Sequence, residues 1–274
     1  MGRIGVWRGG RELDPDLAVE LERLGYGTIW VGGSPNEDLA QVEALLEATS
    51  TIALATGVVN IWRADPATVA ASYHRIEARY PGRFLLGVGV GHPEHDKVYA
   101  KPHQALVDCL DALDAAGVPA HRRALAALGP RVLRLAGARS AGAHPYLTVP
   151  EHTRQARELL GDGPLLAPEH KVVIGTDPQH SREIARDTLG LYLKLENYLA
   201  SFRRLGYDDE DFANGGSDRL VDALVLHGDI ATVAAGVTAH LDVGADHVAV
   251  RVLGDDPLTG FRALAEALAL TPRA

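Results

Sequence analysis

The stretch IALATGVVNIWRADPATVAASYHRIEARYPGRFLLGVGV, residues 52–90, carries the strongest signal for the fold. It contains two apolar runs, Ile52–Val59 and Phe84–Val90, in which apolar and polar residues do not alternate strictly. Such runs are typical of strands that are buried on both faces of a parallel sheet. Between them, Asp65-Pro66 places a hydrogen-bond acceptor before a proline, which is a typical helix start. The stretch therefore predicts a strand, a helix and a second, parallel strand.

The same alternation of predicted strands and helices continues through the rest of the chain. Further short apolar runs are found at Arg3–Trp7, Thr28–Gly32, Arg123–Leu128, Ala143–Leu147, Lys171–Ile174 and His247–Leu253. Helix starts of the same Asp-Pro type occur at residues 14–15, 177–178 and 256–257. Strands that alternate with helices in this way, in a chain of 274 residues, predict one α/β domain over residues 1–274, a (β/α)₈ TIM barrel.

One segment departs from this alternation of strands and helices. Between the seventh and eighth predicted strands lie residues 178–246, with helical patterns at His180–Leu205 and Leu220–Leu226 and an acidic turn between them. We expect a helical insertion on the upper face of the barrel, the face at the carboxyl ends of the strands.

Composition excludes several classes of function. The formal charge of −9 argues against a general binder of nucleic acid or anionic membranes, because such proteins need a basic face. Cys109 is the single cysteine, so no intrachain disulfide forms and a reducing cytoplasm is expected. The first residues lack the apolar core of a signal peptide, and no apolar run approaches the ~20 residues of a membrane span. The expected partner is a small-molecule substrate, and a homodimer is left open.

Candidate site residues follow the predicted strand ends. After the third strand come Asn60, Trp62 and Arg63, and the glycine within that strand permits a bulge or the close approach of a ligand. The fourth strand ends in GVGVGHPEH, residues 87–95, whose alternating glycines leave room for a flat ring or a neighbouring side chain.

The fifth strand ends in ALGPR, residues 127–131. Here a helix N-terminus and the guanidinium of Arg131 come together, which predicts a seat for a phosphate. The alternative interpretation is a capped helix with a solvated arginine.

His92 and His95 raise the question of a metal. Their spacing is not that of HExxH, and Pro93 disfavours a regular helix, so no metal site is expected. Either histidine is better suited to donate a proton near a bound ligand, because imidazole titrates near neutral pH. His92 and His95 are therefore the candidate catalytic residues.

Taken together and in order, these strand ends resemble the luciferase-like superfamily, and within it the oxidoreductases that depend on the deazaflavin coenzyme F420. The resemblance is carried by ATGV at 55–58, Asp65-Pro66, YPGRFLLGVGVG at 80–91, the Gly-Pro turn at 129–130 and GADH at 244–247. It extends over most of the chain, from Arg3 to about Leu253.

The resemblance implies a cofactor, F420, whose deazaflavin ring rests on a bulge in the third strand. It places a non-prolyl cis peptide at Gly57–Val58. The residues that it implies for cofactor binding are Gly57, Val58, Asn60, Val90, Gly91, His92 and His95 around the ring and ribityl chain, and Leu128, Gly129, Pro130 and Arg131 near the phosphate.

The chain also departs from that family. Gly33 and Ser34 stand where members that act on sugar phosphates carry an Asp-His pair, so sugar-phosphate oxidation is in doubt and the expected base is missing. Val90 replaces a threonine, which removes a hydroxyl contact. Trp7 and Trp30 are expected to pack in the barrel interior or at its rim.

Three functions follow as hypotheses. The first is an F420-dependent oxidoreductase that transfers a hydride between the deazaflavin C5 and an unidentified small organic substrate. The second is an FMN-dependent luciferase-like monooxygenase, and the third is a flavin- or deazaflavin-binding protein without catalysis. Identifying the bound cofactor separates the first two.

Overall fold

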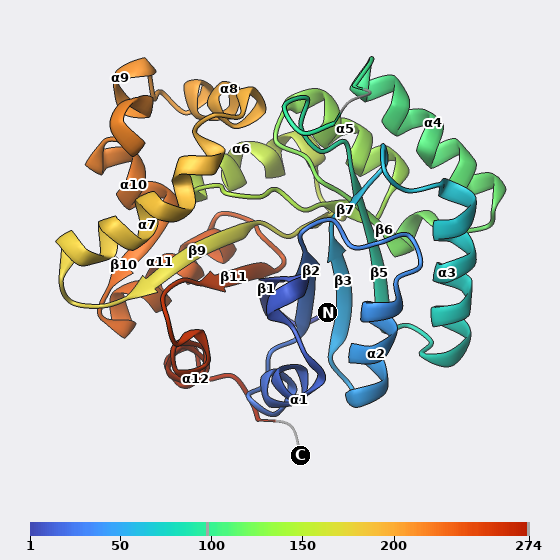
Figure 1. Ribbon diagram of the computed structural model, residues 1–274, viewed down its shortest axis with the longest axis horizontal. Coiled ribbons are helices and arrows are strands. Elements are labelled where there is room, and N and C mark those ends of the chain that lie inside the picture. The colour runs from blue at the N-terminus through green and yellow to red at the C-terminus, as the bar shows by residue number, and fades with distance from the viewer. Residues whose placement is uncertain (97–98, 273–274) are drawn as a thin grey trace.

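A ladder of parallel strands forms the inner layer of the protein, and helices surround it (Figure 1). The computed structural model describes residues 1–96 and 99–272. The strands pair in the order β10-β9-β11-β1-β2-β3-β5-β6-β7-β8. Their bounds are β1 (Ile4–Gly9), β2 (Thr28–Gly32), β3 (Ala53–Gly57), β4 (Val59–Asn60), β5 (Phe84–Gly89), β6 (Arg123–Leu125), β7 (Gly142–Ala143), β8 (Leu165–Leu166), β9 (Glu169–Ile174), β10 (Val225–Gly228) and β11 (Val248–Val252).

β8, at one end of this ladder, and β9, next to its other end, belong to one extended segment, residues 165–174. β8 and β9 are separated only by Ala167 and Pro168. The amide of Ala167 donates to the carbonyl of Ala143 at 2.9 Å on one side, and the amide of Ala249 donates to the carbonyl of Pro168 at 2.9 Å on the other. The segment thus lies between β7 and β11 and closes the ring. With β3–β4 and β8–β9 each taken as one interrupted strand, eight parallel strands form the ring, and β10 is a ninth strand that pairs with β9 outside it. The predicted parallel α/β barrel is confirmed.

The helices begin largely where the sequence predicts. Asp14, Asp65, Asp177 and Asp256 each accept a hydrogen bond from a backbone amide in the first turn of the helix that follows, which has proline at its first position. The helices are α1 (Pro15–Arg23), α2 (Ala40–Ala48), α3 (Pro66–Arg79), α4 (Pro102–Ala115), α5 (Pro130–Arg139), α6 (Pro150–Leu160), α7 (Pro178–Tyr192), α8 (Glu196–Arg204), α9 (Asp209–Phe212), α10 (Asp218–Leu224), α11 (Ile230–Asp242) and α12 (Pro257–Ala267). None of the described helices is both long and apolar enough to cross a membrane.

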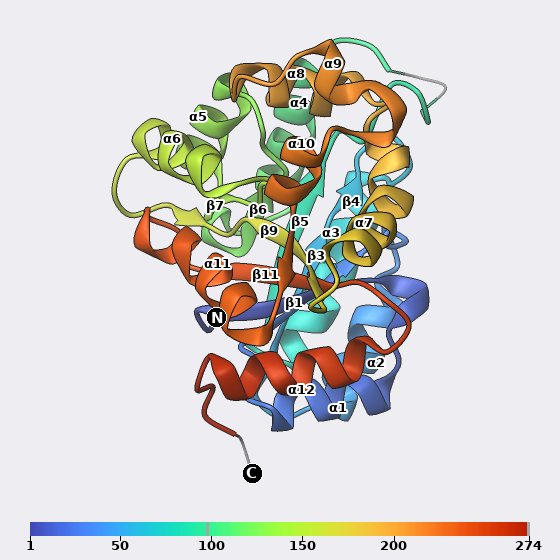
Figure 2. The same ribbon diagram turned by 90° about the vertical axis from the view of Figure 1, so that its left-hand side faces the viewer.

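The segment predicted as a helical insertion contains one strand that the sequence did not indicate. Residues 178–246 form α7 to α11, which lie above and beside the barrel (Figure 2), but β10 follows directly after α10. The predicted helix over Leu220–Leu226 is therefore wrong at its end, where Val225 and Leu226 pair with Lys171 and Val172 of β9. A short apolar run does not distinguish a buried strand from a buried helix, and pairing with β9 decides between them.

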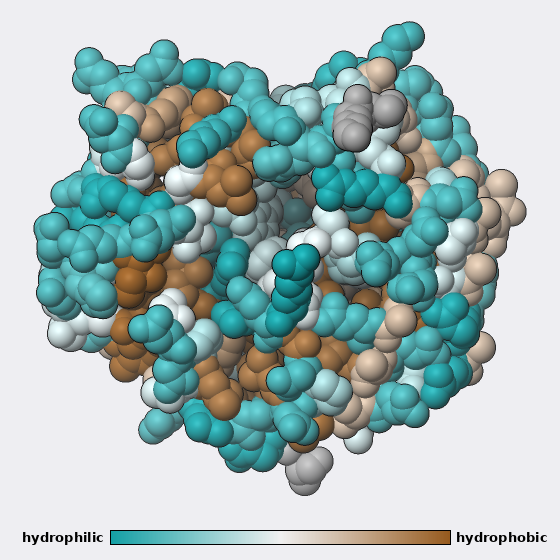
Figure 3. Space-filling model, viewed as in Figure 1, coloured by the Kyte–Doolittle hydropathy of each residue, from teal (hydrophilic) through white to brown (hydrophobic). Residues whose placement is uncertain are grey.

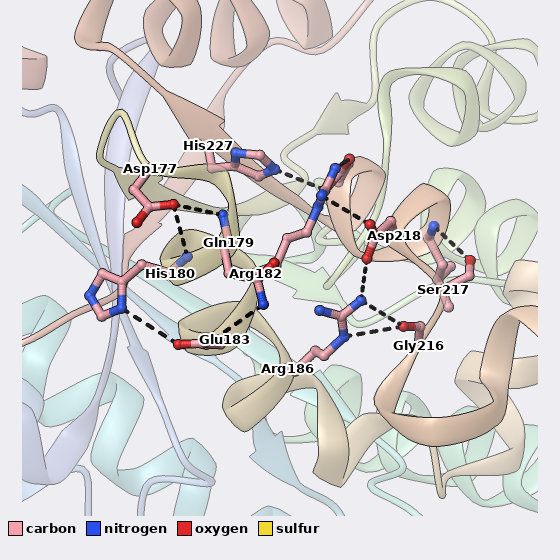
Figure 4. A network of polar contacts seen from close by, with 12 residues as sticks. Asp177, Gln179, His180, Arg182, Glu183, Arg186, Gly216, Ser217, Asp218 and His227 are labelled. Carbon is pink, nitrogen blue, oxygen red and sulfur yellow. Dashed lines mark hydrogen bonds and ion pairs between the residues drawn. The ribbon is translucent and has the colours of Figure 1, made fainter.

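Ion pairs within this inserted segment hold its elements together. Figure 4 shows Arg182 of α7 in a network of polar contacts with Arg186, Asp218 and His227 nearby. Arg182 donates to both carboxylate oxygens of Asp222 on α10, at 2.7 and 2.6 Å. His227 of β10 donates to the same carboxylate at 2.8 Å, and Arg182 also contacts Asp218 at 2.9 Å. A bidentate arginine–carboxylate pair is more directional than a single contact. α7, which forms part of the site described below, is therefore held against α10 and β10.

Several buried histidines make the fold sensitive to acid. Burial lowers the pKa of His144 and His240 to about 3 and that of His247 to about 4. His247 accepts a hydrogen bond from the Trp30 indole at 3.0 Å, which requires an uncharged ring nitrogen, and His240 contacts Thr153 and His170. These rings are neutral in the folded chain.

We predict that the free energy of unfolding falls as the pH drops below about 6.5, because the unfolded chain then binds protons that the folded chain excludes. The loss continues down to the folded pKa values of about 3 to 4. Urea unfolding at a series of pH values between neutral and mildly acidic measures this slope. His247→Gln should reduce the slope by up to about 1.4 kcal/mol per pH unit, the effect of one proton. The exposed His121→Gln is the control, and equal slopes in all three proteins would contradict the prediction.

Candidate active site

A cavity of about 770 Å³ opens at the carboxyl ends of the barrel strands. In Figure 3 the surface is hollowed between the lobe that carries α8 and the lobe that carries α4. Strand ends form one side of the cavity, and α7 and α8 form the other. The lining residues are Trp7, Gly33, Ser34, Gly57, Val58, Asn60, Arg63, Val90, Gly91, His92, His95, Asp96, Ala126, Ala127, Leu128, Gly129, Val132, His144, Tyr146, Leu191, Tyr192, Leu195, Asn197, Tyr198, Ala200 and Arg204.

The floor of the cavity is the indole of Trp7, which comes from β1 and lies across the ends of β2 and β3. A Cβ added to Gly32 would stand 2.0 Å from Trp7 Cζ2, and one added to Gly57 would stand 2.8 Å from Trp7 Nε1. Gly32 and Gly57 are paired neighbours in the ladder. The indole therefore needs glycine at both positions, and the expectation that Trp7 packs at the barrel interior or rim is confirmed.

The third strand is interrupted at the same place. The peptide bond Gly57–Val58 is cis, as expected, and the chain then resumes as β4. The side chain of Val58 fills the space beside β5, where a Cβ on Gly89 would stand 2.7 Å from Val58 Cγ2. The bare side of the GVGVG strand thus accommodates a neighbouring side chain, one of the two uses expected from the sequence.

Two buried polar atoms at the floor have no hydrogen-bond partner among the described residues. They are Nε1 of Trp7 and Nε2 of His144. His144 donates from Nδ1 to the carbonyl of Ala167 at 2.7 Å, so its Nε2 carries a lone pair. Burial lowers the pKa of His144 to about 3, which keeps the ring neutral. The floor consequently offers one donor and one acceptor beside Gly57, and buried polar groups of this kind normally have a partner.

A small cluster of polar side chains joins the segment after β4 to the loop after β5 at the edge of the cavity. Asn60 is buried, and its amide nitrogen donates to both oxygens of Asp96 at 3.2 and 3.0 Å. Arg63 donates to the same carboxylate at 2.7 Å. Burial of Asp96 opposes ionisation, but the hydrogen bonds from Asn60 and Arg63 outweigh it and lower the pKa of Asp96. Asn60 lines the cavity as expected, yet its amide nitrogen is already used to hold the loop after β5.

The two candidate catalytic histidines both line the cavity. His92 donates from Nδ1 to the side-chain oxygen of Asn197 at 2.9 Å, which leaves Nε2 as an acceptor. Burial lowers the pKa of His92, so this ring is neutral. The His92 and His95 rings stand at 90° with their centroids 6.1 Å apart. Within the described residues, no group of three His, Cys, Asp or Glu side chains is placed to hold a metal ion.

The predicted phosphate seat is only partly assembled. Leu128 and Gly129 line the cavity, whereas Pro130 and Arg131 are exposed and are not among the lining residues. Arg131, in the first turn of α5, is exposed, so its contact with a phosphate stays a prediction. Arg204 of α8 lines the cavity instead and donates to the carbonyl of Leu128 at 3.5 Å. No local pattern in the sequence marks this arginine, which is one of several on an amphipathic helix.

Part of the cavity lining is aromatic, and the sequence did not indicate it. Tyr146 follows β7, Tyr192 ends α7 and Tyr198 lies in α8. The hydroxyls of Tyr146 and Tyr192 are 2.9 Å apart. Single tyrosines within helical patterns are normally packing residues, so only the fold shows that these side chains share a site.

Comparison with known proteins agrees with this geometry. Residues 14–117 match the family of luciferase-like monooxygenases. The expected resemblance is therefore confirmed over the segment that contains Gly57, Asn60, Gly91 and His92. Over 95 residues the chain is 33% identical to 4-hydroxyprotoasukamycin monooxygenase of Streptomyces nodosus subsp. asukaensis. Over 104 residues it is 31% identical to F420-dependent glucose-6-phosphate dehydrogenase of Kribbella flavida.

These alignments are short. Each covers 32% of this chain, and they cover 24% of the monooxygenase and 31% of the dehydrogenase. Among solved structures, an F420-dependent secondary alcohol dehydrogenase in complex with an F420-acetone adduct superposes with a TM-score of 0.78 at 16% identity, over 98% of this chain and 99% of that one. A type II Baeyer-Villiger monooxygenase with FMN superposes with a TM-score of 0.70 at 17% identity, over the whole of both chains. These superpositions support the luciferase-like barrel fold.

The packing of Trp7 generates a stability prediction. Gly57→Ala should lower the free energy of unfolding by about 1–3 kcal/mol, because its Cβ overlaps the indole of Trp7 and overpacking has that cost. The control is Gly129→Ser, since a Cβ at Gly129 meets no described atom within 4 Å and serine is a preferred N-cap residue. Urea unfolding measures both variants. Equal stability of Gly57→Ala and the wild type would show that Trp7 is not held against Gly57.

Proposed function

We propose that this chain is an F420-dependent oxidoreductase, which transfers a hydride between C5 of the deazaflavin and a small organic substrate. The observation that carries the proposal is the cavity floor, where the backbone bulge at Gly57–Val58 lies beside an unpaired donor and an unpaired acceptor. A planar heterocycle with carbonyl and N–H groups at its edge suits such a surface. The segment that matches the family model, residues 14–117, contains this bulge, and the chain is 31% identical over 104 residues to an F420-dependent relative.

The residues present fit a cofactor of this kind. The cavity volume of about 770 Å³ lies in the range of small-molecule sites. A Cβ at Gly129 meets open space, and Arg204 donates to the carbonyl of the preceding residue, Leu128. Trp7 Nε1 and His144 Nε2 would hold the polar edge of the ring, and Gly129 with Arg204 would hold the phosphate. When bound, the deazaflavin supplies a two-electron hydride carrier.

The chain's own contribution is orientation and exclusion of water. The bulge would support one face of the ring, so that substrate approaches from the other face, where Tyr192, Leu195 and Tyr198 stand. The neutral His92, held by Asn197, would offer Nε2 to a polar group of cofactor or substrate. Gly33 and Ser34 line the cavity where a sugar-phosphate oxidase of this family carries its Asp-His pair, so we propose a substrate that is not a sugar phosphate.

An FMN-dependent monooxygenase is the second candidate. It is supported by the 33% identity to 4-hydroxyprotoasukamycin monooxygenase over 95 residues. A protein that binds a flavin or deazaflavin without catalysis is the third. All three candidate functions place the cofactor on the same cavity floor. They differ in which cofactor binds and in which molecule, if any, accepts its electrons.

Separate titrations of the purified protein with F420 and FMN, followed by quenching of cofactor fluorescence, decide between the first two candidates. We expect F420 to bind at least about tenfold more tightly than FMN, a difference of about 1.4 kcal/mol. Tighter binding of FMN would favour the monooxygenase, and binding of neither would contradict the proposal. Reoxidation of bound, reduced cofactor by added acceptors then separates an enzyme from a binding protein.

The position of Arg204 generates a second prediction about the cofactor. Arg204→Ala should weaken F420 binding by about 1.5–3 kcal/mol, the value of a charge-assisted hydrogen bond, and added salt should reduce the difference. The control is Arg131→Ala, which removes an exposed arginine near the same helix end. Fluorescence titration at two salt concentrations measures both. A larger effect in Arg131→Ala would return the phosphate seat to the position expected from the sequence.

A further inference from the structure

The aromatic wall of the cavity rests on a buried cluster of charged side chains. Lys171 and Glu169 of β9 are fully buried and paired, with Lys171 Nζ 2.9 and 3.0 Å from the two carboxylate oxygens. The same ammonium lies 3.8 Å from the centre of the Tyr146 ring. Arg251 of β11 donates to the Tyr146 hydroxyl at 3.2 Å. Two cations and one buried anion thus surround the two tyrosines that line the cavity.

One of the two hydroxyl hydrogens of Tyr146 and Tyr192 is not used in a hydrogen bond to a described residue. Burial raises the pKa of Tyr146 and of Tyr192, so both keep their protons near neutral pH. Arg251 is a donor only, so the Tyr146 oxygen accepts from it. One phenol hydrogen is shared across the 2.9 Å contact between the hydroxyls. The second phenol hydrogen finds no acceptor among the contacts of the described residues and is available to a ligand in the cavity.

The simplest arrangement is a directed chain. Arg251 donates to Tyr146 and also has a hydrogen bond with Tyr192. In this arrangement Tyr146 donates to Tyr192, and Tyr192 donates into the cavity. Hydrogen bonds arranged head to tail polarise one another, and a cation at the start strengthens the last donor. Such a donor recognises an oxygen that becomes more negative during reaction.

We infer that the Tyr146–Tyr192 pair binds the carbonyl oxygen of a ketone or aldehyde substrate and gives it a proton during hydride transfer. This inference rests on the proposed function and supplies the proton donor that the Gly33-Ser34 pair lacks. Tyr146 lies against the floor, with its ring centre 4.9 Å from that of Trp7. The indole of Trp7 therefore contacts both Tyr146 and Gly57, and it connects the tyrosine pair to the bulge.

A reduced deazaflavin, when bound, would supply the hydride to the carbonyl carbon of the substrate. The π electron pair of the C=O bond would move to oxygen, and the phenol proton of Tyr192 would form the new O–H bond. The phenolate that remains is stabilised by Arg251 and Lys171 and takes a proton from water as the alcohol leaves. The reverse sequence oxidises a secondary or primary alcohol.

Removal of single oxygen atoms tests the inference. Tyr192→Phe and Tyr146→Phe keep the ring packing and delete one hydroxyl each, and Tyr207→Phe, outside the cavity lining, is the matched control. The first probe is isobutyramide, which presents a carbonyl oxygen but accepts no hydride. Its binding to the F420-loaded protein is followed by tryptophan fluorescence, because Trp7 forms the floor. We expect about tenfold weaker binding in Tyr192→Phe and unchanged binding in Tyr207→Phe.

The second readout is hydride transfer from reduced F420 to acetone, cyclohexanone and benzaldehyde. We expect the rate in Tyr192→Phe to fall by at least about a hundredfold, the lower range for general acid catalysis, while F420 affinity stays the same. Failure of the wild-type protein to bind F420 would contradict the proposed function. Binding of F420 with equal isobutyramide affinity in the wild type and Tyr192→Phe, or with no isobutyramide binding at all, would overturn the inference.

Discussion

The contact of Trp7 with two glycines is the constraint on which the site depends. The indole crosses the ends of β2 and β3, and it occupies the space where side chains on Gly32 and Gly57 would lie. It also meets Tyr146 on one side, and the guanidinium of Arg251 lies 4.8 Å from its ring centre. A single side chain from the first strand thereby joins the floor of the cavity to the aromatic wall and to the buried charges behind it.

This arrangement explains why polar groups are kept in an otherwise apolar barrel. Unpaired polar atoms in the interior are costly unless a ligand or water completes them. Trp7 Nε1 and His144 Nε2 face the same point beside Gly57, and Trp30 stacks on His144 with ring centres 3.8 Å apart. Packing fixes both atoms before a ligand arrives, so binding needs little reorganisation. The inserted helices α7 and α8 complete the cavity from the other side.

Much of the fold follows from local patterns, because the signals are repeated. The Asp-Pro helix starts at residues 14, 65, 177 and 256 all cap helices, and the run at residues 84–90 forms a central strand. β10 escaped prediction because VLHG is short and follows a helix without a break. The bulge and its neighbours, Asn60, Gly91 and His92, were found because they lie close together in sequence. Tyr192, Arg204 and Arg251 were not, because only the closure of the barrel and the return of α7 and α8 bring them to the site.

We propose that a deazaflavin ring lies on the Gly57–Val58 bulge with its polar edge toward Trp7 and His144. A crystal structure of the chain with F420 tests this placement most directly. We expect ring density against the bulge, with Trp7 Nε1 donating to a ring carbonyl and His144 Nε2 accepting from a ring N–H at about 2.7–3.2 Å. Density for the ring elsewhere, or a ring whose polar edge points away from both side chains, would contradict it.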